Sequence, residues 1–411
     1  MTKQMVRWFV AIALGIVVWL GGSSPAAIAL TEEHQLLSDV WRIVNRAYID
    51  ESFNQQNWWF VRQRLLKRPL ESREETYAAI QEMLALLDDP YTRLLRPEQY
   101  RSLQTSTAGE LTGVGLQITK RESDGVLQII APVEGSPAAM ADLRPRDLIL
   151  EIDGVATPTL TLDEAAQRMR GPIGSSVVLK VDRDRDLPIE ITLTRDVVNL
   201  NPVATKLNVT PDGTQIGYIR LSQFNANAAA EVAATIKDYE AKGAEAYVLD
   251  LRGNPGGLLS AGIEIARLWL DEGTIVYTVD RQGVLDSFEA SGSALTDDPL
   301  IVLVNEGTAS ASEILAGALQ DNHRAQLVGT VTFGKGLIQS LFDLFDGSGL
   351  AVTVAKYETP AHHDINRSGI RPDYKVPLGA ITREQLGTPD DPQYQAAVDL
   401  LSQAVVVARA T

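Results

Sequence analysis

The sequence contains no cysteine and only four histidines among its 411 residues. The absence of cysteine excludes disulfide bonds, thiol nucleophiles and thiolate ligands for metals. No two histidines are four residues apart, which is the spacing that a zinc-binding helix requires. We therefore expect neither a metal nor another cofactor. A chain of this length has room for two or three domains with large cores, so it does not need disulfides to fold.

Basic residues are fewer than acidic ones. The sequence has 37 lysines and arginines and 53 aspartates and glutamates, which gives a formal net charge of -16. No basic stripe offsets this charge, which argues against a nucleic-acid partner. The glycine-rich loops that bind nucleotide phosphates, GxGxxG and GxxxxGK[ST], are absent from the sequence. Nucleic acids and nucleotides are therefore not expected among the partners.

Residues 1–29 have the features of a secretory signal peptide. Lys3 and Arg7 form a basic start, and Trp8–Leu20 is a run of 13 apolar residues. Ala27–Ala29 forms a cleavage site of the small-x-small type. The apolar run is too short to span a bilayer comfortably, so an uncleaved anchor is the less favoured alternative. The signal predicts an exported protein.

Residues 30–107 carry apolar side chains at helical spacing, which predicts a helical N-terminal domain. Ser72 and Glu75 form a capping box that opens one of its helices. Trp58 and Trp59 are more consistent with core packing than with a binding surface, because large apolar side chains are mostly buried.

The pattern of apolar residues changes at residue 108, from helical spacing to short strand-like runs. Short strand-like runs punctuated by glycine and proline, including Leu148–Ile152 and Ile189–Thr194, predict a small α+β module over residues 108–196. Its helices are expected over Pro137–Leu143 and Leu162–Met169. Strands and helices alternate over residues 197–411, which is typical of an α/β layer with largely parallel strands. The expected fold class is therefore multidomain α/β.

Ser310 and Lys335 are the candidate catalytic pair. Ser310 precedes an apolar helical run, where its hydroxyl can project from a turn and the N–H of Ala311 is free of helical partners. Taken alone, a serine here is more often a simple N-cap, with Glu313 completing a capping box. Lys335 lies between two glycines after an apolar strand, where burial favours the neutral amine that a general base requires. A solvated surface lysine is the alternative.

Two further positions complete this candidate site. Gln339 would share a helical face with Lys335 if the turn continues as a helix, and its amide would then hold the amine; Glu313 is the alternative orienting group. The glycine pair Gly256-Gly257 follows a buried strand and can turn an N–H toward an oxyanion, although taken alone it is more often a tight strand-to-helix turn. His323 lies beyond the helix that starts after Ser310, so a histidine triad is disfavoured.

Several motifs together resemble those of the carboxyl-terminal processing, or tail-specific, proteases. The resemblance covers essentially all of the chain after the signal. It implies a crotonase-like and ClpP-like α/β protease core with an inserted PDZ domain. The matching motifs are Gly113–Leu116, Asp250–Gly257, Thr308–Glu313, Phe333–Gln339, Thr359-Pro360 and Gly369–Asp373.

The resemblance also implies a role for each matching residue. Ser310 is the nucleophile, Lys335 the general base and Gln339 the residue that orients Lys335. The N–H groups of Gly256 and Ala311 form the oxyanion hole. A PDZ domain adds a peptide as an extra strand and holds its terminal carboxylate in a backbone loop. The residues implied in that binding are Gly113, Val114, Gly115, Leu116, Met169 and Arg170.

Three further segments are similar to the branch of this family from oxygenic phototrophs: Asn54–Phe60, Leu94–Tyr100 and Ala355–Asp364. That branch removes a C-terminal extension from the photosystem II D1 precursor. This implies an enzyme of the thylakoid lumen or periplasm that has peripheral contact with the membrane of its substrate. A general quality-control protease of the same compartment is one alternative. A PDZ protein that binds tails without cutting them is another. A crotonase-like enzyme acting on acyl thioesters is the least favoured, because no device for binding coenzyme A is evident.

Overall fold

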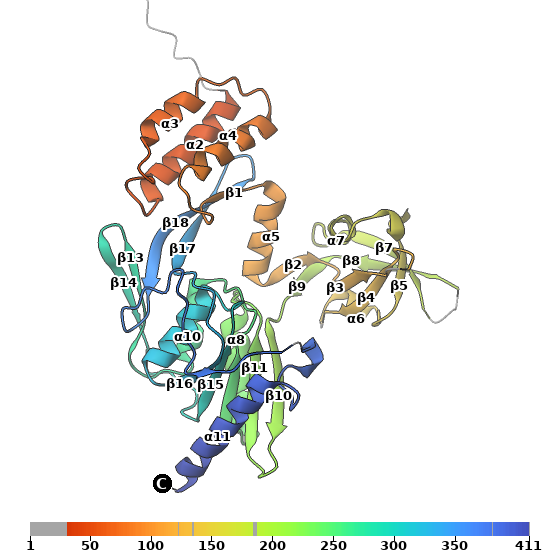
Figure 1. Cartoon of the computed structure of the whole chain (residues 1–411). Helices are drawn as coiled ribbons and strands as arrows, with labels where there is room; N and C mark the ends of the chain where they lie inside the picture. The colour runs from red at the N-terminus through yellow and green to blue at the C-terminus, as the bar shows by residue number, and fades with distance from the viewer. Residues whose placement is uncertain (1–30, 122, 134, 184–186, 380, 411) are drawn as a thin grey trace, which may run out of the picture. The chain divides into compact units, whose positions relative to one another are not determined.

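The computed structural model describes residues 31–121, 123–133, 135–183, 187–379 and 381–410 (Figure 1). The expected signal peptide, residues 1–29, lies outside the described residues. The chain divides into two compact units: residues up to Leu94 together with Leu341–Val352, and Leu95–Ser340 together with Thr353–Thr411. The first unit is therefore discontinuous in sequence.

The N-terminal part of the first unit is helical. Ser72 Oγ accepts a hydrogen bond from the N–H of Glu75 at 3.3 Å, which confirms the predicted helix start. Leu36 and Leu37 on the first helix and Ile80 and Met83 on the third are fully buried. The helices are α2 (Glu32–Ala47), α3 (Trp58–Leu65) and α4 (Arg73–Ala85).

The prediction that Trp58 and Trp59 both pack in the core is half wrong. Trp58 is 3% exposed and stacks on Phe53, with ring centroids 5.2 Å apart. Trp59 is 62% exposed and Phe60 is 59% exposed. Consecutive residues on a helix point about 100° apart, so only one of the two tryptophans can face the core.

Helix α5 (Pro97–Ala108) leads into a small module with the antiparallel strand order β3-β4-β5-β7-β8. Strands were predicted over Leu148–Ile152 and Ile189–Thr194 and a helix over Leu162–Met169, and all three are confirmed to the residue. The elements of the module are β3 (Leu116–Lys120), β4 (Leu127–Pro132), α6 (Pro137–Met140), β5 (Leu148–Ile152), β6 (Val155–Ala156), the 3-10 turn η1 (Thr157–Thr159), α7 (Leu162–Met169), β7 (Ser176–Asp182) and β8 (Ile189–Thr194).

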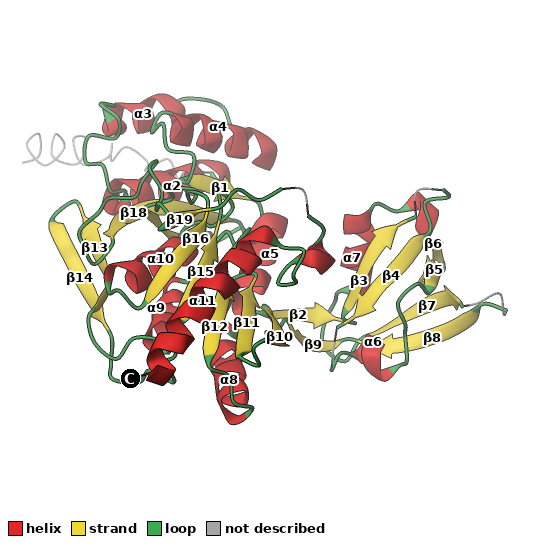
Figure 2. Cartoon of the chain, turned by 60° about the horizontal axis from the view of Figure 1, so that its bottom comes forward, coloured by secondary structure: helices red, strands yellow, loops and turns green. Residues whose placement is uncertain are grey.

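A two-stranded ribbon joins this module to the rest of its unit. Strand β2 (Glu110–Gly113) pairs antiparallel with β9 (Asp196–Asn199). The chain therefore enters and leaves the module at adjacent points (Figure 2).

The second sheet has the strand order β10-β11-β12-β15-β16-β19, and all its pairs after β11 are parallel. Alternate residues of each strand face opposite layers, so Ile219 and Leu249 pack toward α8, α9 and α10, whereas Tyr218 and Val248 pack toward α11. This three-layer arrangement confirms the expected α/β class. Its elements are β10 (Val203–Val209), β11 (Gln215–Leu221), α8 (Ala228–Ala241), β12 (Ala246–Asp250), α9 (Leu259–Arg267), β15 (Leu300–Val304), α10 (Ala311–Asp321), β16 (Ala325–Gly329), β19 (Tyr374–Lys375) and α11 (Pro392–Ala410).

Among the remaining described elements, β18 was expected in part from the sequence, whereas β1, β13, β14 and β17 were not. The hairpin β13–β14 pairs with β18, where Tyr277 lies opposite Glu358. Long-range pairing stabilises these strands. The elements are β1 (Arg93–Leu95), β13 (Thr274–Asp280), β14 (Gly283–Glu289), β17 (Leu337–Asp343), β18 (Gly349–Glu358) and the short 3-10 turn η2 (Arg383–Gln385).

Candidate active site

The loops that carry the glycine pair, the serine and the lysine lie together. They follow β12, β15 and β16, which are neighbouring parallel strands, so the carboxyl ends of these strands share one edge of the sheet. The N–H of Ala309 donates to the carbonyl of Asn254 at 3.0 Å, and the N–H of Phe333 donates to the carbonyl of Thr308 at 3.0 Å. Backbone hydrogen bonds therefore join all three loops.

Ser310 has a backbone conformation that non-glycine residues rarely adopt. Its φ of 58° and ψ of -119° lie outside the left-handed helical region. Such strain costs about 1–3 kcal/mol and is typical of residues whose placement serves a function. Ser310 immediately precedes α10, as the sequence predicts, so the N–H of Ala311 belongs to the open end of the helix.

Glu313 ties the serine turn to the lysine loop. Its side chain is fully buried, and its carboxylate accepts four hydrogen bonds. Oε2 accepts from the N–H groups of Ser310 and Lys335, both at 2.9 Å. Oε1 accepts from Thr332 Oγ1 at 2.6 Å and from the N–H of Gly334 at 2.7 Å. The structure thus makes Glu313 an orienting group for the backbone of both candidate catalytic residues.

Tyr357 holds the same two residues from their carbonyl side. Its hydroxyl lies 2.6 Å from the carbonyl oxygen of Lys335 and 3.1 Å from that of Ser310. The side chain projects from β18 and is 1% exposed. The residue was missed in the sequence because it lies 22 positions after Lys335 in a strand without a motif of its own.

Substitution of Glu313 by Gln tests this arrangement. The amide oxygen can replace only one carboxylate oxygen, and the amide NH2 then faces two donors. We expect kcat to fall roughly 10- to 100-fold with KM little changed, because a small misplacement of reacting groups has effects of this size. Initial rates on a tailed peptide give both constants. Glu306→Gln is the matched control, since Glu306 is exposed and accepts a hydrogen bond from Thr330 Oγ1. An equal loss in both variants would contradict the role of Glu313.

The proposed oxyanion donors lie close to the serine. A Cβ on Gly256 would sit 2.9 Å from Ser310 Cβ and 2.9 Å from the nitrogen of Ala311, and φ at Gly256 is 95°. Only glycine therefore fits at this point. In this conformation the N–H of Gly256 donates to Asn254 Oδ1 at 2.9 Å. This N–H must turn away from Asn254 before it can donate to an oxyanion.

The helical continuation considered for Gln339 is wrong. Gln339 lies on strand β17, and its Nε2 is 3.5 Å from Thr353 Oγ1 on the adjacent strand β18. Lys335 and Gln339 are thus not related by a helical turn. The glycines beside Lys335 are compatible with either local structure, and the pairing of β17 with β18 decides between them.

The residues expected to bind a peptide tail form one corner of the small module. Gly113 ends β2 and lies against the end of α7, where an added Cβ would be 3.1 Å from the carbonyl oxygen of Met169. Arg170 follows α7 and is exposed. Met169 is 5% exposed and belongs to the core of the module. Gly115 has a φ of 73° and packs on Ser136, and Val114 is buried.

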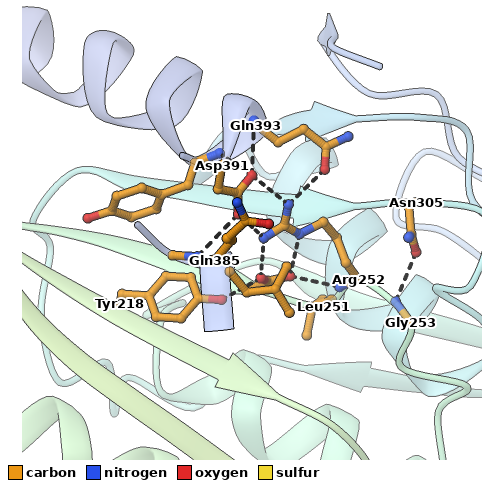
Figure 3. A network of polar contacts seen from close by, with 12 residues as sticks. Tyr218, Leu251, Arg252, Gly253, Asn305, Gln385, Asp391 and Gln393 are labelled. Atoms are coloured by element: carbon orange, nitrogen blue, oxygen red, sulfur yellow. Dashed lines mark hydrogen bonds and ion pairs between the residues drawn. The ribbon is translucent and has the colours of Figure 1, made fainter. Parts of the chain in front are cut away.

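A buried ion cluster lies beside the glycine loop (Figure 3). Arg252 Nη2 is 2.6 Å from Asp250 Oδ2 and 2.7 Å from Asp391 Oδ2, and both carboxylates are fully buried. Arg252 Nη1 also donates to Gln393 Oε1 at 2.9 Å, and the Tyr218 hydroxyl donates to Asp250 Oδ2 at 2.6 Å. The cluster ties the start of α11 to the end of β12.

Charge pairing dominates this cluster. Burial on its own would raise the pKa of Asp391, but the hydrogen bonds and charge of Arg252 hold that pKa below its ordinary value. Burial would likewise lower the pKa of Arg252, yet its bonds to Asp250 and Asp391 raise it overall. Asp391 also caps α11 by accepting the N–H of Gln393 at 3.1 Å. The sequence signal for this cap is the pair Asp391-Pro392, because an N-cap residue is often followed by proline at the first helical position. This signal was missed in the sequence.

The histidine that follows α10 lies far from Ser310. His323 lies beyond the far end of the 11-residue helix α10, about 16 Å along the axis from Ser310. No cluster of three metal-ligating side chains occurs among the described residues. Within the same part of the chain, no helix combines the length and apolar character needed to cross a membrane.

Comparisons with known proteins relate the chain to one family of peptidases. A model of peptidase family S41 matches residues 215–376, and a PDZ domain model matches residues 128–183. The chain is 59% identical to a carboxyl-terminal-processing protease of Synechocystis sp. over 98% of this chain and 94% of the relative. It is 49% identical to the chloroplastic carboxyl-terminal-processing peptidase 2 of Arabidopsis thaliana over 92% of this chain and 75% of that protein. A solved photosystem II D1 C-terminal processing protease is 40% identical, with a TM-score of 0.57 and coverage of 89% of this chain and all of that one.

Proposed function

Because this chain belongs to the carboxyl-terminal-processing proteases of peptidase family S41, we propose that Ser310 and Lys335 are the Ser–Lys dyad with which it cleaves polypeptides. The observation that carries the proposal is the double attachment of both residues, through their N–H groups to Glu313 and through their carbonyls to Tyr357. A pair held in this way is pre-organised for proton transfer.

The proposed reaction is acyl transfer in two steps. Ser310 Oγ attacks the scissile carbonyl while the neutral Lys335 amine takes its proton, and the N–H groups of Gly256 and Ala311 receive the negative charge of the tetrahedral intermediate. The protonated Lys335 then gives its proton to the leaving amine. Water hydrolyses the acyl-enzyme by the same route. Gln339 is proposed to support the Lys335 amine.

We propose that the PDZ module spans residues 108–196 and receives the free C-terminus of the substrate at Gly113–Leu116, Met169 and Arg170. The precursor of photosystem II D1 is the proposed substrate, supported by the similarity to a D1 C-terminal processing protease. The apolar start of the sequence supports export to a thylakoid lumen or periplasm. A general tail-specific protease of that compartment is the second candidate.

These proposals are tested by incubating the protein of residues 30–411 with two substrates, a D1-tail peptide and an unrelated unstructured protein with a free C-terminus. We expect a D1-tail peptide to be cut once near its C-terminus, and Ser310→Ala to leave it intact, as read by mass spectrometry. Amidation of the terminal carboxylate should slow the cut, because a backbone loop that binds carboxylate loses its charged partner. If only an unrelated unstructured protein with a free tail is cut, the D1 assignment is wrong. If neither substrate is cut, the dyad proposal is wrong.

A further inference from the structure

Helix α3 presents two large aromatic side chains to solvent. Trp59 is 62% exposed and Phe60 is 59% exposed, whereas Trp58 and Leu65 on the other side of the helix are buried. The Trp41 indole N–H donates to the carbonyl of Trp58 at 2.8 Å and fixes the helix against its neighbour α2. The two exposed rings therefore cannot turn inward without exposing the buried face, and an exposed aromatic pair marks an interaction surface.

Positive charge accompanies these rings. Residues 52–70 contain four basic residues and no acidic one, in a chain whose net charge is -16. Arg64 lies one turn after Phe60 on the same face, and Lys67 follows in the next turn; both are exposed. Glu82 lies 2.6 Å from Arg68 and 3.7 Å from Arg64, so one carboxylate serves two of the guanidinium groups. The four basic residues of 52–70 therefore outnumber this one paired carboxylate.

We propose that Trp59, Phe60 and Arg64 of α3, together with Lys67 just after this helix, form an aromatic–basic face that binds the surface of an anionic lipid bilayer. Aromatic rings favour the boundary between headgroups and acyl chains, and basic side chains are attracted to anionic headgroups. The acidic remainder of the chain is repelled by such a surface. Attraction must therefore come from a local patch, and this face combines both required kinds of side chain. The inference concerns a second site and does not depend on the Ser–Lys dyad.

Flotation with lipid vesicles tests the proposal on the protein of residues 30–411, which contains all the described residues and lacks the apolar start of the chain. We expect it to float with vesicles containing phosphatidylglycerol and not with pure phosphatidylcholine. Trp59→Ala with Phe60→Ala should reduce the bound-to-free ratio at least tenfold. Arg64→Gln with Lys67→Gln should reduce it severalfold, and 0.5 M salt should have a similar effect because charged surface contacts are screened.

Matched controls test whether binding depends on this particular face or on any exposed apolar or charged side chain. Met140→Ala removes an apolar side chain that is 74% exposed on α6, and Lys237→Gln with Lys242→Gln removes two exposed charges from α8. Both controls should bind vesicles as the wild type does, and all variants should cleave a soluble peptide at the wild-type rate. The proposal is overturned if the wild type fails to bind anionic vesicles, if it binds phosphatidylcholine equally, or if the α3 variants bind as the wild type does.

Discussion

Cleavage should be lost when Lys335 is replaced by Ala, with kcat lowered by about 10²- to 10⁴-fold or more, the usual contribution of a general base. Lys335→Arg should be equally inactive. A guanidinium group stays protonated in proteins and cannot take the proton of Ser310. The Lys335 loop itself should persist in both variants, because Glu313 and Tyr357 hold backbone atoms of residue 335.

A double variant tests whether Ser310 and Lys335 act as one catalytic unit. Ser310→Ala with Lys335→Ala should be no slower than the slower of the two single variants, because members of a catalytic unit are strongly non-additive. Initial rates on a tailed peptide measure the effect, and unchanged unfolding midpoints show that the fold is kept. Lys242→Ala is the control, since Lys242 is exposed and pairs only at the surface with Asp238. Cleavage by Lys335→Ala within tenfold of wild type would exclude Lys335 as the base.

Replacing Arg252 by Leu should lower the free energy of unfolding at neutral pH by about 3–5 kcal/mol, the usual effect of removing one partner from a buried ion pair. The carboxylates of Asp250 and Asp391 would be left buried without their shared cation. Urea unfolding measures the loss. Arg267→Leu is the control, because its pair with Glu264 is partly exposed and is expected to contribute less than about 1 kcal/mol.

The loss should also depend on pH. Pairing with Arg252 lowers the pKa of Asp391 in the folded protein, so this contribution to stability is complete above the unfolded pKa of about 3.9. It disappears as the pH falls through the lower, folded pKa. The difference in unfolding free energy between wild type and Arg252→Leu should therefore shrink below about pH 4. A difference that stays constant from pH 7 to pH 3 would rule out charge pairing as its source.

Local patterns in the sequence are enough to find the three loops of the candidate site. Strands such as Leu300–Val304 are apolar at every position, and glycine or serine motifs follow them directly. Elements with strong short-range signals, such as α7 with its capping box, are predicted to the residue. Parallel order then brings the loops to one edge without further information.

Features that depend on distant partners could not be predicted in this way. The strand that carries Gln339 exists because β18 pairs with it, and the role of Tyr357 depends on the same pairing. The exposure of Trp59 is a different case. The helical spacing of Trp58, Val61 and Leu65 already places Trp59 off the buried face, so stricter use of the 3.6-residue period would have shown it.

The discontinuity of the first unit has a consequence for synthesis on the ribosome. Its helices are made early, but Asp346, which accepts the Tyr77 hydroxyl at 2.8 Å and lies 3.5 Å from Arg73, is made about 270 residues later. The unit therefore cannot be completed during most of translation. Asp346 lies between Lys335 and Tyr357 in the sequence, so the same late stretch of chain supplies the proposed base, its carbonyl anchor and the last part of the N-terminal unit. A nascent chain that lacks this stretch can complete neither the N-terminal unit nor the candidate active site.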